Sequence, residues 1–486
     1  MRISFSSQLR LDCNSIEQVQ LNTGCRDEII PILTALQYLY SDISLRERVL
    51  ELVASDVNKT TRDDVGREGF SYWEILVLAS VRLGCNLDYD KLQDLAENHR
   101  NLRHIMGIGD WQQDINLSWR RIRDSVCLLQ PETIEKVNQL IVKRGQELHG
   151  DAQSRVRADS FVIETNVHYP TESRLIWDGV RKIFDVSKFL LKHVSVPGWR
   201  QAPHLRKRIK EQVRKISFIS SSKSPKVKEG LPKAYEALLK RTSSLLDRAK
   251  QLLKKSRKKS TIKLSLKAEA LQEWIKLTEQ VCDTARRRVL LGEQVPNQEK
   301  LFSLFEKHTQ LYRRGKAGTP NQFGRLALVF EDAAGFISHY KLMPREALDS
   351  DVIVEQTRRV QTLHEGKIES ASFDRGFYTP QNAIDLATII ESPCLPPRPP
   401  KQYAEAMKTG SVEFRQARQN HPGIESAIGA LQSGNGLKRC RDRTERGMER
   451  YVGLAILGRN LHTLGKLLIA KSNAQCEAAY SKRKTA

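Results

Sequence analysis

Apolar residues recur at three- and four-residue steps through most of the first 150 positions, which is the period of helices that bury one face. The repeat is clearest in EIIPILTALQYLY, SYWEILVLASVRLG and PETIEKVNQLIVKRG. Gly84 is suited to end the second of these helices, while Asp88 or Asn86 can cap the next. Ser118 can cap a later helix in the same way. We therefore expect an all-α N-terminal domain over residues 1–150.

That later helix opens with the basic sequence Trp119, Arg120, Arg121. Short helices joined by glycine turns are compatible with helix-turn-helix units, in which a recognition helix enters the major groove. The same pattern is also found in plain helical bundles, so both interpretations stay open. If the helices form helix-turn-helix units, the domain binds DNA, and Arg120 and Arg121 contact the DNA.

Strand-type runs begin after residue 150. The first, VRADSFVI, alternates toward a buried strand, and the helical repeat SRLIWDGVRKIFDVSKFLLKHV follows it. Two further runs flank a turn from Asp332 to Gly335, and another run, in ASFDRGFY, ends at Asp374. Strands that alternate with helices predict an α/β core in two parts, residues 151–200 and 306–470. We expect the polar tail at 471–486 to be frayed.

A strongly basic region separates the two parts of this core. Residues 201–260 contain 19 Lys or Arg against 4 Asp or Glu, and long helical repeats lie within and after them. A charge run is most often a solvated face, but an excess this one-sided favours contacts with phosphates. We expect a helical insertion over 201–305 with a basic, DNA-contacting face. Its densest cluster consists of Lys254, Lys255, Arg257, Lys258 and Lys259.

Composition narrows the class of partner. The 486-residue chain has 80 Lys and Arg against 57 Asp and Glu, a net charge of +23 and a pI near 9.7. This excess is more than solubility requires and suits a polyanionic partner, for which nucleic acid is the default. The hydrophobic content of 40% is sufficient for buried cores in about three domains of ~150 residues.

Several other classes receive no support from the sequence. The eight cysteines form no CxxC pair and no zinc-type spacing, which predicts reduced thiols in a cytoplasmic protein. The first residues lack a signal-type apolar region, and charges interrupt the most apolar late segment, 451–469, so we expect no targeting signal and no membrane span. A phosphate loop is missing, so we expect no use of ATP.

Three acids occupy positions that favour a functional role for the carboxylate. Asp159 lies inside the first strand-type run, where a buried charge is costly unless it is paired or binds a metal. Asp374 lies at a strand end, where open α/β sheets hold ligands. Glu425 lies near the start of the helix-like segment PGIESAIGALQ, beside an apolar stripe that we expect to face the sheet.

Together these acids predict a two-metal site for phosphodiester chemistry. Cleavage needs an activated water or hydroxyl and a stabilised leaving oxygen, and two divalent ions about 3.5–4 Å apart provide both. Mg²⁺, or Mn²⁺ in its place, needs only a few carboxylates besides water and phosphate oxygens. We expect Asp159 to bridge both ions, Asp374 to complete one site and Glu425 to complete the other.

Each acid has a structural alternative. Asp159 could pair with Arg155 or Arg157, although both alternate onto its own strand face and would be exposed. Asp374 could simply form a turn, in which case Asp332 is the rival acid. The rivals of Glu425 are the nearby acids Glu413, Asp442, Glu445 and Glu449.

With these residues in place, the chain resembles a DDE transposase of a bacterial insertion sequence, close to the ISNCY group. The resemblance spans nearly the whole length. Its motifs are DSFVIETNVHYPTES around Asp159, the RRGK and FGRLALVFED segments, SFDRGFY around Asp374, and HPGIESAIGALQSGNGLKRCRDRTERGMERYVGLAILGRNL around Glu425. SFDRGF and the Glu425 block are fairly specific in combination and modest singly.

The resemblance implies an RNase H-like core in which Asp159, Asp374 and Glu425 hold the metal ions. It also implies that the protein binds the ends of its element, cuts them and joins 3′ hydroxyls to target DNA. Such proteins act as homodimers or higher oligomers on double-stranded DNA, which here means at the nucleoid in the bacterial cytoplasm.

One position departs from the family pattern. Related transposases often carry a Lys two helical turns after the Glu, whereas this chain has Gln432 there. Other basic residues must then hold the phosphates near the acids. The expected DNA contacts of the core are Arg314, Lys316, Arg415, Arg418, Lys438 and Arg439.

Two other functions stay open at this stage. One is a catalytically silent descendant that acts as a DNA-binding repressor, although the presence of all three acids argues against it. The other is an RNase H-like nuclease or resolvase. Such an enzyme would need no sequence-specific recognition of ends, so a helical DNA-binding front domain disfavours it.

Overall fold

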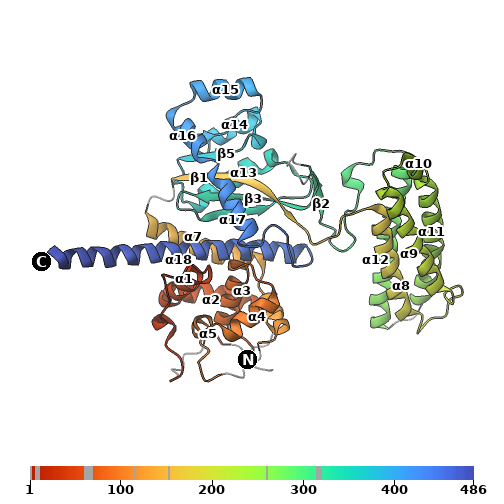
Figure 1. Ribbon diagram of the computed structural model, residues 1–486, viewed down its shortest axis with the longest axis horizontal. Coiled ribbons are helices and arrows are strands. Elements are labelled where there is room, and N and C mark those ends of the chain that lie inside the picture. The colour runs from red at the N-terminus through yellow and green to blue at the C-terminus, as the bar shows by residue number, and fades with distance from the viewer. Residues whose placement is uncertain are drawn as a thin grey trace. The chain divides into compact units, whose positions relative to one another are not determined.

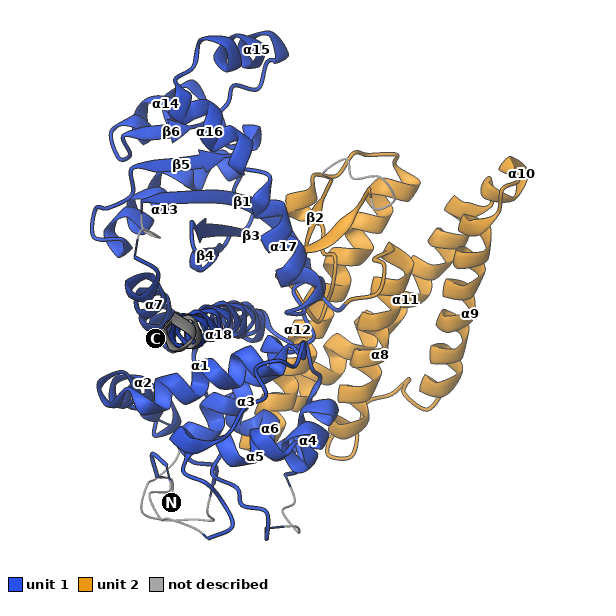
Figure 2. Cartoon of the chain, turned by 60° about the vertical axis from the view of Figure 1, so that its left-hand side comes forward, with its two compact units in different colours: residues 1–166, 325–486 blue, residues 167–324 orange. Residues whose placement is uncertain are grey.

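The computed structural model of the protein describes residues 3–5, 11–59, 69–112, 117–150, 154–258, 261–313 and 320–485, without the side chains of 480–485. The chain forms two compact units, coloured separately in Figure 2. Unit 1 contains residues 1–166 and 325–486, and unit 2 contains residues 167–324.

Unit 1 begins with short helices, and nearby polar side chains cap the first turns of several of them. Helix α3 opens with a capping box, in which the Ser71 hydroxyl accepts a bond from Glu74 N at 3.2 Å and the Glu74 carboxylate accepts one from Ser71 N at 2.7 Å. Asp88 caps the next helix by accepting from Lys91 N. The helices of this region are η1 (Ile16–Gln18), α1 (Ile29–Ser41), α2 (Ile43–Val57), α3 (Tyr72–Gly84), α4 (Tyr89–Asn98), α5 (Arg100–Ile105), α6 (Trp119–Val126) and α7 (Pro131–His149).

Unit 1 also contains a mixed β-sheet. In it β1, β5 and β6 run parallel in that order, β3 borders β1 on the other side, and β4 pairs antiparallel with β3. These strands are β1 (Arg155–Glu164), β3 (Gln322–Asp332), β4 (Ile337–Leu342), β5 (Ser370–Phe373) and β6 (Ser392–Cys394). A short strand, β2 (Gln310–Tyr312), pairs with residues 322–324 of β3, within unit 2.

Further helices flank this sheet. They are α13 (Asp349–Leu363), the 3₁₀ turn η5 (Arg375–Phe377), α14 (Pro380–Ala387), α15 (Pro400–Thr409), α16 (Val412–Asn420) and α17 (Gly423–Ser433). Helix α16 packs on β5 and β6, and α17 packs on β1. The expected mixed sheet flanked by helices is therefore confirmed.

One long helix, α18 (Glu445–Thr485), joins the front helices to the sheet. Figure 1 shows it lying between the sheet and helices α1 to α3, and it contacts α1, α3, α7, α17 and β4. Buried Asn460 donates from Nδ2 to Ile337 O at 2.9 Å and accepts from Ile337 N at 2.8 Å, which satisfies the backbone at the start of β4. One continuous core therefore runs from α1 through α18 to β1, β3 and α17.

The approach of α18 to the front helices depends on glycine. A Cβ on Gly458 would lie 2.6 Å from the Cα and N atoms of Gly84, so the backbones of α18 and α3 meet directly. A Cβ on Gly465 would collide with the Pro31 carbonyl in α1. Because no side chain separates these backbones, the two contacts set the depth at which α18 packs.

Unit 2 is a helical bundle with a core of its own. Its buried cluster includes Trp199, Leu238 and Ile275, and all its members lie between residues 175 and 304. Its helices are α8 (Glu172–Leu190), α9 (Ala202–Ser221), α10 (Pro225–Lys228), α11 (Leu231–Ser256), α12 (Ile262–Ala285), the π-helical turn Arg286–Leu290 and η4 (Asn297–Glu299).

The boundaries of this unit differ from those we read in the sequence. The expected insertion covered residues 201–305, whereas unit 2 also takes in α8, which we had assigned to the core. Helix α8 packs against α9, α11 and α12 because its apolar face, including Ile176 and Ile183, completes the core of the bundle.

Two further expectations concern the end of the chain and membranes. The tail at 471–486, which we expect to be frayed, is helical as far as Thr485, where α18 ends. Residues with good helix propensity extend a helix at little cost in free energy once a buried segment has nucleated it.

In the described part of the chain, no helix has the length and apolar character needed to cross a bilayer.

Replacing Gly458 by Ala should destabilise unit 1. The methyl group would be forced against the Gly84 backbone, and overpacking of this kind costs about 1–3 kcal/mol. Gly429, on the exposed side of α17, is the matched control, because a Cβ there meets nothing within 4 Å and Gly429→Ala should stabilise by roughly 0.5–1 kcal/mol. Urea unfolding followed by circular dichroism measures both changes, and equal shifts would contradict the packing argument.

Candidate active site

Asp159 and Asp374 come together because their strands are neighbours. The parallel register of β1 and β5 runs from the pair Arg155 and Ser370 to the pair Ala158 and Phe373. Asp159 and Asp374 are the residues that directly follow this last pair, Asp159 within β1 and Asp374 just after β5. Adjacent strands lie about 4.8 Å apart, and residues in register point to the same face. If the register continues by one residue, these two acids, more than two hundred residues apart in sequence, lie opposite each other on one sheet face.

The two acids differ in their surroundings. Asp159 is partly buried within β1, and its Oδ1 atom accepts a bond from Ser160 N at 2.7 Å. Asp374 is partly buried just after β5, in the N-cap position of η5, where its side chain makes no capping bond. The strand-end position that we expected for Asp374 is thus the one observed.

Arg157 lies on the same face, two residues before Asp159, and is held from two sides. Its Nε donates to Glu331 Oε2 of β3 at 2.6 Å, and its Nη1 donates to the Asn420 carbonyl at 3.0 Å. Its side chain is only 29% exposed, and that of Glu331 is 4% exposed. We expected Arg157 to be exposed; that is wrong, because an acid 174 positions away lies against it.

The turn between α16 and α17 is pinned to the sheet. Besides the Arg157 bond to Asn420, the ring Nδ1 of buried His421 lies 3.1 Å from the Ser372 hydroxyl of β5. A Cβ on Gly423 would collide with the Arg157 guanidinium, 2.6 Å from its Cζ. Only glycine therefore lets α17 begin where it does.

His421 is also an electrostatic neighbour of Asp374. Burial, the charge of Arg418 and the charge of Arg157 lower the pKa of His421 to about 4, against the opposing effect of Asp374. The imidazole is therefore neutral at neutral pH. It lies beside the second acid as a hydrogen-bonding group and not as a cation.

Glu425 lies in the first turn of α17, beside the helix face that packs on β1. Ile424, Ile428 and Leu431 are buried, as the expected apolar stripe requires, and Glu425 is exposed. Within the described residues its carboxylate forms no hydrogen bond or ion pair. The pinned turn therefore presents an uncommitted carboxylate next to the strand that carries Asp159.

The donor set suits a hard divalent cation, although the side chains are not gathered around one. Carboxylate oxygens at Asp159, Asp374 and Glu425 are the ligands that Mg²⁺ and Mn²⁺ prefer. In the described residues no group of three or more His, Cys, Asp or Glu side chains is close enough to hold a metal. Like-charged carboxylates repel one another, so their convergence requires the cation and the phosphate oxygens that it binds.

Most of the rival acids are engaged in structural contacts. Asp332 is buried under α7 and accepts bonds from Gln146 Nε2, Ala334 N and Phe336 N at 2.9–3.0 Å. Asp442 pairs with buried Arg82, Glu445 pairs with Arg325, and Glu449 pairs with Arg446. Glu413 is exposed on α16.

The basic residues expected near the acids have different environments. Arg439 lies 3.4 Å from Glu164, and the chain from Lys438 to Cys440 pairs with Glu164, which places both cations at the carboxyl end of β1. Arg415 is exposed on α16, whereas Arg418 is half-buried and close enough to His421 to lower its pKa. Arg314 and Lys316 lie outside the described residues.

The basic residues expected to bind DNA elsewhere are also only partly available. On α6, Arg120 and Arg121 are exposed, with their guanidinium groups 5.2 Å from the Trp119 ring and 4.5 Å from the Phe70 ring. In unit 2, Lys254 and Lys258 are exposed. Lys255 donates to the Ser195 carbonyl and Arg257 to Gln272 Oε1, while Lys259 lies outside the described residues.

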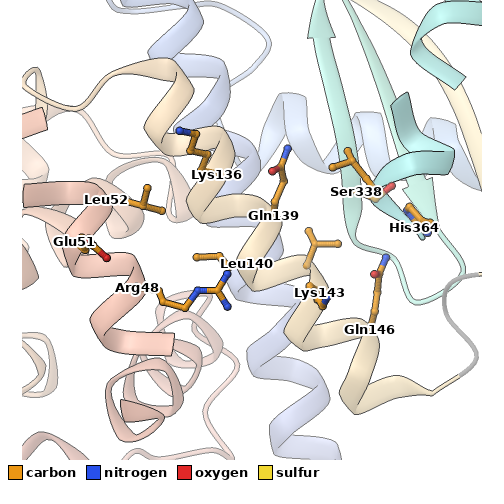
Figure 3. Close-up of a pocket in the computed structure, with 12 residues that line it drawn as sticks. Arg48, Glu51, Leu52, Lys136, Gln139, Leu140, Lys143, Gln146, Ser338 and His364 are labelled. Atoms are coloured by element: carbon orange, nitrogen blue, oxygen red, sulfur yellow. The ribbon is translucent and has the colours of Figure 1, made fainter. Parts of the chain in front are cut away.

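Two cavities lie in unit 1. One, of 610 Å³, covers the first residues of β1, β5 and β6 on the face that carries Arg157 and Ser372. The other, of 430 Å³, lies between α2 and α7 and is shown in Figure 3. It contains Arg48, Lys136 and Lys143, and none of the three acids lines either cavity.

The sequence did not reveal the residues that pin the third acid. Arg157, Glu331, His421 and Gly423 act through contacts between distant segments. The one available signal was the alternation that places Arg157 on the face of Asp159.

Scans against protein-family models, curated proteins and solved structures found no match for this chain.

Gly423→Ala should displace α17 and weaken binding of Mn²⁺ at the acids, because Arg157 is held on both sides and cannot move away. Overpacking of about 1–3 kcal/mol, if lost entirely from binding, corresponds to a loss of affinity of roughly 5- to 150-fold. The double variant Gly423→Ala with Arg157→Ala should bind Mn²⁺ more tightly than the two single effects predict, with a coupling of about 0.5–3 kcal/mol. Isothermal titration with Mn²⁺ measures the cycle, and strictly additive effects would rule out the contact.

Asp332 should make unit 1 less stable as the pH rises. Burial raises its pKa from 3.8 to about 7, so the folded state favours the protonated form more than the unfolded chain does. The resulting stability is fully present below about pH 4 and is lost as the pH rises toward 7, by roughly 1.4 kcal/mol per unit of pKa difference. Asp332→Asn should flatten this fall in urea midpoints measured between pH 5 and pH 8, and an unchanged slope would contradict the assignment.

Proposed function

We propose that the protein is a Mg²⁺-dependent DNA transposase of the DDE type, with an RNase H-like core. In this proposal it binds the ends of an insertion sequence, cleaves phosphodiester bonds there and joins 3′ hydroxyls to target DNA. Asp159, Asp374 and Glu425 are its metal ligands, and double-stranded DNA is its substrate. It acts as a homodimer or higher oligomer on DNA.

The observation that carries this proposal is the register of β1 and β5. It makes Asp159 and Asp374 neighbours on the face of a mixed sheet, and α17 packs on the same β1 with Glu425 at its start. Parallel strands leave their carboxyl ends as the natural place for a ligand. Asp159 lies in the middle of β1, level with the end of β5, so the proposal has the three acids meet where β5 ends.

The residues around these acids support the same chemistry. Two bound divalent ions would activate the attacking oxygen and stabilise the leaving oxygen. Arg157 and Gly423 hold α17 against the strand, so that Glu425 is presented at a set position. Lys438 and Arg439, at the carboxyl end of β1, supply positive charge where a DNA backbone would pass.

DNA recognition is divided between parts of the chain in this proposal. Helix α6 exposes Arg120 and Arg121 and belongs to the region that we expect to read the element ends. The sheet face contacts backbone phosphates through its metal ions and carries no base-reading helix. The net charge of +23 provides the general attraction to DNA.

Asp159→Asn, Asp374→Asn and Glu425→Gln should each abolish strand cleavage and joining while binding to DNA ends stays within about threefold of wild type. The reason is that the ions serve the transition state more than the ground-state complex. Incubation with end-containing DNA and Mg²⁺, followed by mapping of nicks and joined strands, measures the effect. Glu445→Gln is the matched control, because that acid pairs with Arg325 and should leave cleavage largely intact.

The same experiment separates the other functions. Cleavage that survives in one variant removes that acid from the metal set. Sequence-specific binding by the wild type without any metal-dependent cleavage would instead indicate a transposase-derived repressor. Cleavage without joining, and without preference for the ends, would indicate an RNase H-like nuclease.

A further inference from the structure

The positive charge of the chain is concentrated in unit 2. Residues 167–324 contain 36 Lys and Arg against 14 Asp and Glu, a net +22 out of the +23 of the whole chain. Unit 1 is balanced, with 44 basic and 43 acidic residues. A small domain needs a net charge of only about 2–8 for solubility, and a larger excess repels itself in the absence of a polyanion.

Within unit 2 the charge is segregated to one side of the bundle. Helices α9, α10 and α11 together contain 15 Lys and Arg against 3 Asp and Glu, whereas α8 and α12 together contain seven of each. Helix α9 packs against α11, and α8 packs against α12. The bundle therefore has a strongly basic layer and a neutral layer.

The outer face of α9 is the most accessible part of the basic layer. Ile209, Val213 and Ile216 are buried on its inner side. On the outer side Lys207, Arg208, Lys210, Arg214 and Lys215 are all exposed, with Glu211 as the single acid of the helix. In the described part of the chain, Lys207, Arg208, Arg214 and Lys215 form no ion pair.

The acids of the neutral layer, by contrast, are occupied. Glu279 of α12 pairs with Lys250 at 2.6 Å, and Glu273 pairs with Lys307. The cluster that the sequence singled out, near Lys254, is also partly occupied, because Lys255 and Arg257 bond to other parts of the bundle. Exposed cations without an ion pair in the described residues are most concentrated on α9, and Lys226 and Lys228 of α10 follow them.

We propose that the outer face of α9, continued by α10, is a docking surface for the phosphate backbone of double-stranded DNA, separate from the three acids. The choice of DNA as the polyanion rests on the proposed function. A 20-residue helix is about 30 Å long, which matches about nine base-pair steps of 3.4 Å. An anionic membrane fits less well, because the apolar side of α9 is buried in the bundle and only Phe218, 72% exposed, interrupts its polar face.

The test compares two matched triple variants of the full chain. One replaces Lys207, Arg214 and Lys215 of α9 by Gln, and the other replaces Lys263, Lys267 and Lys276 of α12 by Gln. Binding to a 40-base-pair duplex of arbitrary sequence is measured at several salt concentrations. The α9 variant should lower the log-log slope by up to about 2.7, and the α12 variant should leave it unchanged. Thermal midpoints check that both variants are folded.

Each alternative outcome has a distinct meaning. Equal losses of slope in the two variants, or no loss in the α9 variant, would overturn the docking surface. Tighter binding of the wild type to phosphatidylserine vesicles than to the duplex, abolished in the α9 variant, would replace DNA by a membrane and overturn it as well. The proposed catalysis is judged separately, by cleavage in the Asp159→Asn variant, so either idea can fail while the other stands.

Discussion

The depth at which α18 packs is the constraint on which unit 1 depends. This helix touches the front helices on one side, where glycine lets the backbones meet, and the sheet on the other, where Asn460 bonds to the backbone. At Gly458 the opposing group is the Gly84 backbone, and at Asn460 it is the backbone at the start of β4. A side chain at the first position would separate the layers, and loss of the amide at the second would leave buried polar groups unpaired.

The candidate active site inherits its geometry from this frame. Strand β1 is held in the sheet by β3 and β5. Its Arg157 is paired with Glu331 of β3 and donates to the Asn420 carbonyl, and these bonds fix the start of α17 relative to β1. The ion pair is nearly buried on the Glu331 side, so removal of either partner leaves a charge without compensation. It therefore specifies where Glu425 lies as much as it stabilises the fold.

The two units separate two electrostatic tasks. Unit 1 is close to neutral, and its charged residues are largely arranged in pairs such as Arg82 with Asp442. Unit 2 carries almost all the excess charge on a bundle with its own core, so the proposed attraction of a polyanion rests on that unit.

Periodicity and capping, which depend only on nearby residues, were enough to predict the front helices, the strand containing Asp159, the strand ending at Asp374 and the helix that begins near Glu425. Composition alone predicted a polyanionic partner. The parallel pairing of the strand of Asp159 with the strand that ends before Asp374, the pairing of Arg157 with Glu331 and the extent of unit 2 were decided by the tertiary structure. Each of these joins segments that are far apart in the chain, and a local pattern carries no information about which distant segment will lie opposite it.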